Sequence, residues 1–215
     1  MTSIVSSLSV KQIAALSTDV IKKLTTDDIA ALSAAQVGAL SKDQVQALGG
    51  GVVALEQKVA AISSRAIVGL TPEQMTALGD KVSHLTTAQI SAMYAEEQFS
   101  ALTSGQLGAF TQSQMSGLTA AQLATLDETE LEMFEPDEIA SISVKAISGL
   151  DVSKLDDNQV KALTKAQIGA LTAAQLQALA GVQQDLEGED TPSKFQLLDT
   201  TQIQAISVKA LKTFG

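Results

Sequence analysis

The chain has 215 residues, carries a formal net charge of −10 and contains no cysteine and no tryptophan. The negative charge makes nucleic acid and anionic membrane surfaces poor partners, and without cysteine there are no disulfides, catalytic thiols or thiolate metal sites. Hydrophobic residues make up 45% of the chain but aromatic residues only 3%, so we expect a thin, repetitive aliphatic core.

No run approaches the eighteen or so apolar residues that identify a transmembrane helix, so we expect no membrane insertion. The first residues, MTSIVSSLSVKQ, lack the basic segment and the apolar run of a cleaved signal peptide.

Leucine recurs every eight residues from the start of the chain, within the consensus L-[ST]-x-x-Q-[IVLM]-x-A. In a continuous α-helix, eight residues rotate about 80° past two full turns, so the leucines would spiral around the rod and share no face. The repeat interior is rich in Ala and Gln, which favours helix over strand. A helix broken once per repeat resolves this conflict. The first series comprises Leu8, Leu16, Leu24, Leu32, Leu40 and Leu48, and the spacing returns over 102–150, 155–179 and 198–214.

The break is expected directly after each leucine, where a Ser or Thr precedes a Gln by three residues. This is the capping box, in which the hydroxyl accepts from the backbone of the Gln and the Gln side chain accepts from the backbone of the cap. Leu8 and Ile13 flank the first box as a hydrophobic staple. The predicted boxes are Ser9/Gln12, Ser33/Gln36, Ser41/Gln44, Thr71/Gln74, Thr103/Gln106, Thr119/Gln122, Thr164/Gln167 and Thr172/Gln175.

The sequence therefore predicts an all-α fold: a solenoid, or superhelical coil, of very short helices with one helix per octapeptide. A single helix of about six residues is too short to be stable in water, so each must pack on its neighbours. We expect one domain over residues 1–215. The handedness of the coil and the number of helices per turn do not follow from the pattern.

Several units depart from eight residues. Two shortened units without hydroxyl caps occupy 49–62, where the glycines favour a kink, and 93–101 gains a residue. After Leu150 the pattern predicts an insertion of five residues, 151–155, with the register resuming at Leu155. The largest insertion, at about 180–197, is predicted to be a surface loop, or a longer helix followed by a turn. It is the best candidate for a partner-contact loop, and the residues predicted to serve there are Asp185, Glu187, Glu189, Asp190, Lys194 and Phe195.

A second unit type lacks the Gln altogether, as in SSRAIVGL from Ser63 and SVKAISGL from Ser143. Its capping box is therefore incomplete. The sequence assigns it no function beyond a helical corner.

Residues suited to catalysis are sparse. His84 is the only histidine, so neither a catalytic triad nor a multi-histidine metal site can be assembled from one chain. The acidic run 127–138 offers oxygen ligands for calcium, but Asp127 and Glu130 fit a capping box and Pro136 an early helical position. DLEGED, at 185–190, lacks the ligand spacing of an EF-hand. We predict no catalytic, cofactor-binding or metal-ligating residue, and no enzyme.

The stretches LSAAQVGALSKDQVQAL (32–48) and LTKAQIGALTAAQLQAL (163–179) resemble the L-[ST]-x-x-Q-[IV]-x-A octapeptide arrays of large repetitive bacterial proteins. Some of those arrays are adhesin-like or are secreted without a cleaved N-terminal signal. The resemblance thus implies a bacterial surface or secreted setting, and it supplies no catalytic residues.

Three functions remain open. The leading hypothesis is a non-enzymatic structural protein, a stalk, spacer or subunit that assembles end to end with itself. The alternative is a protein- or peptide-binding module that uses the 180–197 insertion or the groove of the coil. The third is an enzyme or secreted effector with a carboxylate site.

Overall fold

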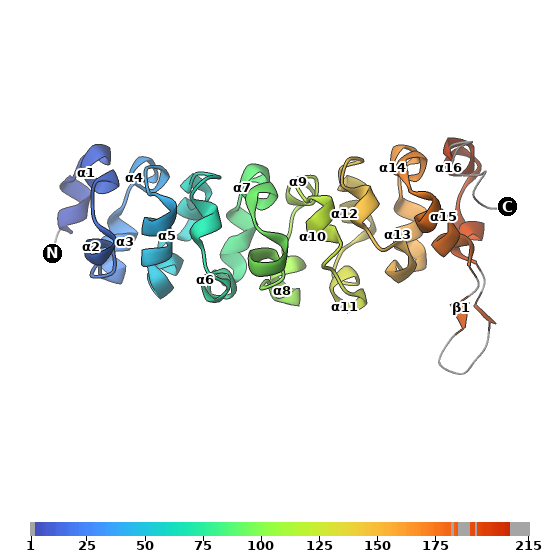
Figure 1. Ribbon diagram of the computed structural model, residues 1–215, viewed down its shortest axis with the longest axis horizontal. Helices are drawn as coiled ribbons and strands as arrows, with labels where there is room; N and C mark the ends of the chain where they lie inside the picture. Colours follow the sequence, from blue (N-terminus) through green and yellow to red (C-terminus); the bar gives the residue numbers. More distant parts are fainter. Residues whose placement is uncertain (1–2, 182, 185–189, 192, 207–215) are drawn as a thin grey trace. The chain divides into compact units, whose positions relative to one another are not determined.

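The structure is a computed structural model that describes residues 3–181, 183–184, 190–191 and 193–206. The chain divides into two compact units, Met1–Phe110 and Thr111–Gly215, and each is described by itself. Both consist of short helical segments joined at sharp corners (Figure 1). The predicted all-α class is confirmed; whether residues 1–215 form a single domain stays a prediction.

The described residues of the N-terminal unit form thirteen helical segments, eight of them α-helices of four to six residues. They are η1 (Ile4–Ser7), α1 (Val10–Ala14), α2 (Thr18–Ile21), α3 (Thr26–Ala31), α4 (Ala34–Gly38), α5 (Lys42–Ala47), η2 (Gly49–Ala61), η3 (Ile67–Gly69), α6 (Pro72–Ala77), η4 (Gly79–His84), α7 (Thr87–Ala92), η5 (Ala95–Phe99) and α8 (Ser104–Leu107).

The C-terminal unit also consists mainly of short helical segments. Its described elements are α9 (Gln112–Met115), α10 (Ala120–Leu123), α11 (Glu128–Leu131), α12 (Pro136–Ser141), η6 (Ile147–Gly149), η7 (Val152–Lys154), α13 (Asp157–Ala162), α14 (Lys165–Ala170), α15 (Ala173–Ala180), β1 (Gln183–Gln184), β2 (Asp190–Thr191), η8 (Lys194–Leu197) and α16 (Thr200–Ala205). Within the predicted insertion, β1 and β2 pair antiparallel. They are the only strands in the described part of the chain.

The predicted helix starts are confirmed at every Ser/Thr–Gln pair. In α1 the Ser9 Oγ accepts from the backbone of Gln12 at 3.3 Å, while the Gln12 Oε1 accepts from the backbone of Ser9 at 2.8 Å. The same reciprocal box opens α4, α5, α6, α8, α10, α14 and α15. Each octapeptide thus begins and ends its own helix, because two of the unpaired N–H groups at the helix start are satisfied locally.

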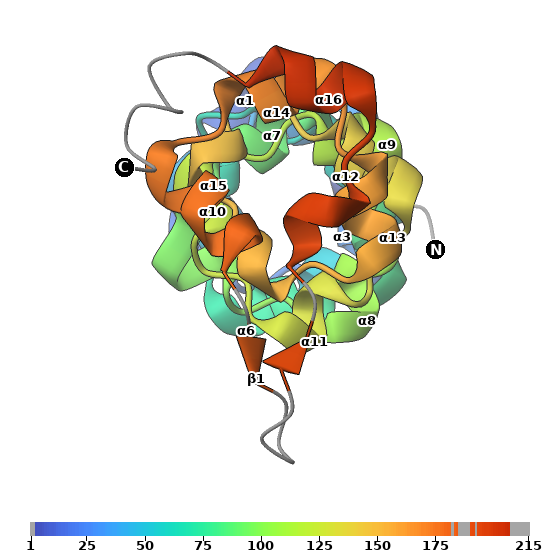
Figure 2. The ribbon, with the colours of Figure 1, turned by 90° about the vertical axis from the view of Figure 1, so that its right-hand side faces the viewer.

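Within each unit, helices pack on segments three units away along the chain. In the N-terminal unit α4 packs on α1 and α5 on α2; in the C-terminal unit α13 packs on α12 and α16 on α14. Figure 2, in which the C-terminal unit faces the viewer, shows α13, α14 and α15 on three sides of one turn, with α16 beside α14. Three octapeptides therefore make one turn within each unit.

The core lies inside these turns and is built from two positions of the octapeptide. The apolar residue after the Gln is buried in every described unit except the last, where Ile203 is exposed; Ile13, Val37 and Ile168 are 0% exposed. The closing apolar residue, usually Leu, is buried from Leu32 onward. Aromatic rings are few, and Phe99 and Phe110 meet edge to face with their centroids 6.3 Å apart. The predicted thin aliphatic core is confirmed.

The irregular units keep the same place in the coil by changing helix type. The nine-residue unit at 94–102 absorbs its extra residue as a π-helical turn, η5. The five residues 151–155 are not an insertion, and the prediction of one is wrong: η7 forms a complete side that packs on α15, with Val152 and Leu155 buried. A unit of five residues can replace one of eight because a 3₁₀ turn is tight enough to close it.

The kink predicted for 49–62 is confirmed and lies at Glu56. Its φ of 51° and ψ of −132° interrupt η2, and Glu56 is the only non-glycine residue with positive φ among the described residues. Its carboxylate lies 3.5 Å from the Lys81 Nζ. Such a conformation costs a residue with a Cβ about 1–3 kcal/mol.

We therefore expect Glu56→Gly to be more stable than Glu56→Ala by about 1 kcal/mol, because both lose the ion pair and only glycine relieves the strain. Urea unfolding followed by circular dichroism measures the difference. Gln46, exposed inside α5, is the control: there alanine should be the more stable by about 1 kcal/mol. The same order at both positions would contradict strain at Glu56.

Candidate functional site

The most regular polar feature of the structure is a set of buried glutamines that join successive turns. Gln167, 1% exposed, accepts from the Thr164 backbone through Oε1 at 2.7 Å, as part of its capping box. Its Nε2 donates to the carbonyl oxygens of Ile139 and Ile142, each at 2.9 Å, on the preceding turn. Comparable pairs of bonds are made by Gln36, Gln44, Gln74, Gln89, Gln98, Gln106, Gln159, Gln175 and Gln202.

The acceptors are the carbonyls that a short helix leaves without an internal partner at its C-terminal end. Each glutamine amide thus satisfies the start of its own helix and the end of a helix one turn earlier. Among the described residues, no buried side-chain N or O atom is left without a hydrogen bond. Sequence reasoning assigned these glutamines the capping function alone and missed the bonds between turns.

Lysines replace glutamine in three units that lack it. Lys58 Nζ donates to Ala30 and Leu32, Lys154 Nζ to Leu126, and Lys194 Nζ to the carbonyl oxygens of Ser153 and Leu155 at 2.7 and 2.6 Å. An ammonium group offers three donors, so it can serve the same carbonyl pair.

We expect Lys194→Met to lower the free energy of unfolding by about 1–3 kcal/mol, because two partly buried carbonyls lose a charged donor. Lys165→Met, at an exposed position of α14, is the control and should change stability by at most about 0.5 kcal/mol. Chemical denaturation of both variants compares them; equal effects would mean that the Lys194 bonds contribute nothing.

The predicted partner-contact residues lie at or near the 180–197 insertion. Asp185, Glu187 and Glu189 fall outside the described residues, and Asp190 belongs to β2. Lys194 anchors η8 to the preceding turn, and Phe195 is half-buried beside it. Ser193 Oγ donates to the carbonyl of Leu179 at 2.9 Å. The base of the insertion is thus fixed on the coil, and partner contact there stays a prediction.

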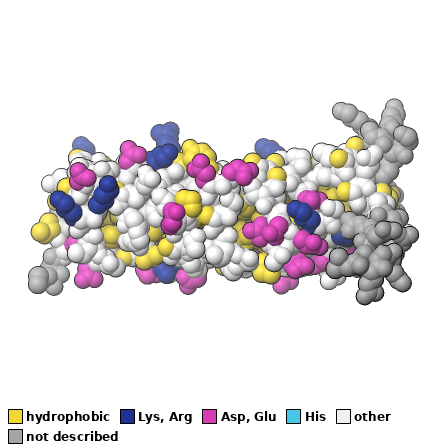
Figure 3. Space-filling model, turned by 60° about the horizontal axis from the view of Figure 1, so that its bottom comes forward, with side chains coloured by type: hydrophobic (Ala, Val, Ile, Leu, Met, Phe, Trp, Pro, Cys, Tyr) yellow, Lys and Arg dark blue, Asp and Glu magenta, His cyan; other side chains and the backbone are white. Residues whose placement is uncertain are grey.

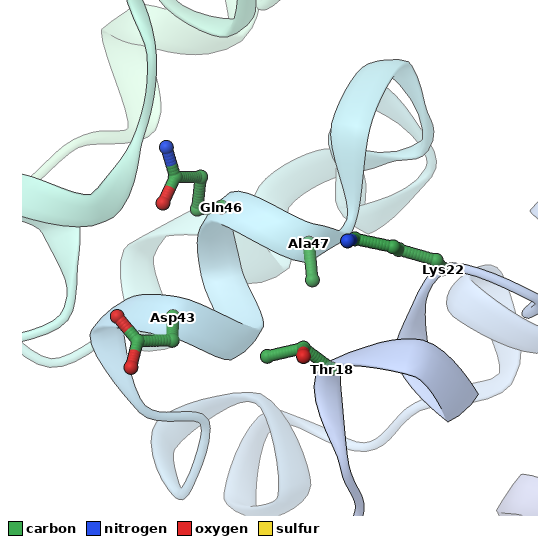
Figure 4. A pocket seen from close by; sticks show the side chains of 5 residues that line it. All are labelled: Thr18, Lys22, Asp43, Gln46 and Ala47. Atoms are coloured by element: carbon green, nitrogen blue, oxygen red, sulfur yellow. The ribbon is translucent and has the colours of Figure 1, made fainter.

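Two surface grooves in the N-terminal unit lie between neighbouring turns. One, between α2 and α5, has a volume of about 500 Å³, and the other, between α5 and α6, about 330 Å³. Figure 4 shows side chains from α2 and α5 around the first groove, with the Asp43 carboxylate and the Lys22 ammonium at different sides of it. The first groove is lined by Thr18, Lys22, Asp43, Gln46 and Ala47.

This lining offers one hydroxyl, one ammonium, one carboxylate and one amide, and Lys22, Asp43 and Gln46 are exposed. Exposed groups of this kind can hydrogen-bond a polar chain lying across the turns. General acid–base catalysis instead needs groups whose pKa is adjusted by a water-poor environment.

The acidic run 127–138 is explained largely by helix starts. Asp127 and Glu130 form the capping box of α11, and Pro136 begins α12, as predicted. Burial, together with the nearby Glu135 charge, raises the pKa of Glu138, although a hydrogen bond from the Glu135 backbone opposes the rise. In the described part of the chain, no three His, Asp or Glu side chains are grouped to hold a metal ion. His84 lies exposed at the end of η4.

Asp199, at the start of α16, should make the stability of the fold depend on pH. Its carboxylate accepts from the Thr201 hydroxyl at 2.7 Å and from the Gln202 backbone at 2.8 Å, and these bonds lower its pKa. Because the pKa is lower in the folded state, its contribution is present at neutral pH and is lost as pH falls through the folded pKa. We expect Asp199→Asn, which still caps the helix, to lose less in melting temperature on acidification than the unsubstituted chain. A parallel loss in both would contradict this role.

The surface carries charged groups of both signs among many neutral side chains. Figure 3 shows acidic and basic side chains interspersed on one face, with hydrophobic side chains scattered between them. Over the residues that the structure describes, none of the helices has the length and apolar character to span a bilayer.

Comparison with known sequences identifies the repeat. A search of curated proteins finds no match. Residues 21–56, which include α3, α4 and α5, match the family described as the ALTTAQ repeat. The resemblance to octapeptide arrays is therefore confirmed, and the chain is a repeat protein whose residues 21–56 are similar to the ALTTAQ repeat.

Proposed function

We propose that the chain is a non-enzymatic structural protein, an α-solenoid that serves as a stalk, spacer or self-assembling subunit. The observation that carries this proposal is the repeated hydrogen bonding between turns. Each buried glutamine amide accepts a hydrogen bond at the start of its own helix and donates hydrogen bonds to the preceding turn. In the Gln of the consensus, both the oxygen and the nitrogen of the side-chain amide thus make structural hydrogen bonds.

These bonds suit a protein that must resist bending and stretching. In repeat proteins each unit contacts only its neighbours, so resistance to bending and fraying depends on the interfaces between them. Where glutamine makes the contact, the interface combines buried aliphatic side chains with two charge-free hydrogen bonds inside the core. Salt screens exposed ion pairs but has little effect on such bonds, so a spacer of this kind would keep its stiffness across ionic strengths. The bacterial surface or secreted setting is supported by the resemblance alone.

The open grooves also support the non-enzymatic part of this proposal. The grooves near α5 are open, and the charged groups that line the larger one are exposed. An enzyme would need its reacting groups held in a site that excludes water.

The solenoid is tested by inserting a second copy of residues 156–179, which form one turn of three octapeptides, after Leu179. Small-angle X-ray scattering should show an increase of about 10 Å in maximum dimension, the spacing of packed helices, with helical circular dichroism rising in proportion. A Gly/Ser insert of equal length is the control and should add no helix. An unchanged maximum dimension would overturn the solenoid.

The binding module remains the second candidate, favoured by the anchored base of the 180–197 insertion. Replacing residues 183–191 with a short Gly/Ser linker leaves Ser193 and Lys194 in place. A spacer should keep its circular dichroism, melting temperature and biological role after this change. Loss of the role with the fold intact would support binding through the insertion.

A further inference from the structure

Position 4 of the octapeptide, counted from the residue after the closing leucine, is the Gln that joins one turn to another. Among the described residues fifteen helices begin with a capping box, and in twelve of them position 4 is Gln. The other three have an acid there: Asp28 in α3, Glu130 in α11 and Glu138 in α12. An ionised carboxylate accepts hydrogen bonds but donates none, so it can cap its own helix without joining turns.

Glu138 holds this position at an interface between turns. Its helix, α12, packs on α9 of the preceding turn, and its side chain is half-buried. The Glu138 Oε2 accepts from the backbone N–H of Glu135 at 2.9 Å, which is the capping bond. In the described part of the chain this side chain makes no further hydrogen bond and no ion pair. The capping function of position 4 is therefore kept here, and the donor function is missing.

Toward the following turn α12 is joined in the ordinary way. The Gln159 Nε2, from α13, donates to the carbonyl oxygen of Phe134, just before α12, at 2.8 Å. The Gln167 Nε2, from α14, donates to the carbonyl oxygen of Ile142, just after α12, at 2.9 Å. An amide does not titrate near neutral pH, whereas the carboxyl of Glu138 does. The two sides of α12 should therefore respond differently to acid.

We propose that the interface between α12 and α9 is an acid-strengthened joint, in which the two helices are held more tightly when Glu138 is protonated than when it is ionised. Protonation removes a charge from a half-buried position and gives the carboxyl an O–H donor, which is the function that glutamine supplies at position 4 elsewhere. The other carboxyl oxygen can still accept from the Glu135 backbone, so the helix start is preserved. Such a joint would act in the same way in a spacer and in a binding module.

The surroundings of Glu138 favour its neutral form. Burial, followed by the charge of Glu135, raises the pKa of Glu138 against the opposing effect of the capping bond. Within the described residues α9 has no titratable side chain, and Asp137, beside Glu138 on α12, is exposed. The charged residues of the elements on the other side are exposed as well: Asp156, Asp157 and Lys161 at α13 and Lys165 on α14.

The raised pKa fixes the sign of the effect. A carboxyl whose pKa is higher in the folded state contributes stability that is present below its unfolded pKa and is lost as the pH rises through the folded pKa. The joint is thus tight in acid and weakened at neutral pH. Asp199, whose pKa is lowered, responds in the opposite sense, so the effect of Glu138 has to be measured as a difference between variants.

Glu138→Gln places at position 4 the residue that other interior turns use. At pH 7 we expect the full-length variant to melt about 2–4 °C above the unsubstituted chain. This advantage should shrink as the pH is lowered to about 4.3, the ordinary pKa of glutamate, because protonation then gives the unsubstituted chain a neutral donor as well. Glu132→Gln removes the same charge at the exposed end of α11. It is the matched control and should gain no advantage that depends on pH.

Hydrogen exchange followed by mass spectrometry locates the effect and needs only the unsubstituted chain. After correction for the intrinsic pH dependence of exchange, protection of the α9 and α12 backbone should rise about fivefold on acidification, with no such rise in α14. In Glu138→Gln the protection of α9 and α12 should not depend on pH. A variant that melts with the unsubstituted chain at pH 7, one whose advantage is equal at both pH values, or an equal gain in protection over α9, α12 and α14 would each overturn the joint.

Discussion

Replacing Gln167 with glutamate should lower the free energy of unfolding by about 3–5 kcal/mol at pH 7, the range found when a buried polar partner is exchanged for an uncompensated charge. The introduced carboxylate can still accept from the Thr164 backbone, so the capping box survives. It can no longer donate to the carbonyls of Ile139 and Ile142, and its charge faces two oxygen atoms. The lost stability therefore comes from the hydrogen bonds between turns and not from the capping box.

The matched control is Gln12→Glu. Gln12 has the same position in the octapeptide and the same capping box, but it is exposed in the first turn. There a carboxylate should change stability by at most about 0.5 kcal/mol, and in the favourable direction, because it lies near a helix N-terminus. Guanidinium or urea denaturation of both variants isolates the bonds between turns from capping.

Acid adds a second test of the same variant. Burial beside carbonyl oxygens should raise the pKa of the introduced carboxyl in the folded state above its unfolded value. Protonation then restores a neutral group with one donor, so the deficit relative to the unsubstituted chain should shrink as the pH is lowered through the raised pKa. A deficit that is independent of pH, or equal to that of Gln12→Glu, would show that Gln167 only caps its helix.

Much of the local structure could be predicted because it is encoded within eight residues. Ser9, Gln12 and Leu8 lie within one helical turn of each other, so the cap and staple follow from spacing alone. The octapeptide period excluded a continuous helix for the same reason. The kink within 49–62 was predicted from the glycines at 49–51, but the dihedrals that interrupt η2 lie at Glu56.

The number of units per turn could not be predicted, because it depends on the angle at each corner and on which helix meets which across the sequence. The second function of glutamine left a signal that was overlooked. A capping box accepts Glu as readily as Gln, and the helix dipole prefers Glu, yet twelve of the fifteen capping boxes among the described residues have Gln. Only a need to donate explains that preference. The binding or self-assembly role of the chain has no comparable short-range signal.

Replacing Gly149 with alanine should lower the free energy of unfolding by about 3 kcal/mol or more, at the upper end of the range for overpacking. A Cβ at this position would lie 1.9 Å from the carbonyl oxygen of Ala120 and 2.6 Å from its carbonyl carbon. These are backbone atoms of α10, which packs directly on η6, so no side-chain rotation can make room. The two segments must separate.

Gly69 tests whether this is a rule of the unit type, since SSRAIVGL and SVKAISGL both have glycine as the seventh residue. There a Cβ would lie 2.2 Å from the carbonyl oxygen of Lys42, so Gly69→Ala should be similarly damaging. Gly105, in α8, has open space around its Cβ position, and Gly105→Ala should be neutral or stabilising by about 0.5–1 kcal/mol. If thermal and urea unfolding give the same change in stability for Gly149→Ala and Gly105→Ala, then η6 does not approach α10 as closely as the structure shows. If only the two seventh-position glycines are sensitive, the units without glutamine hold their turn by backbone contact in place of the missing amide.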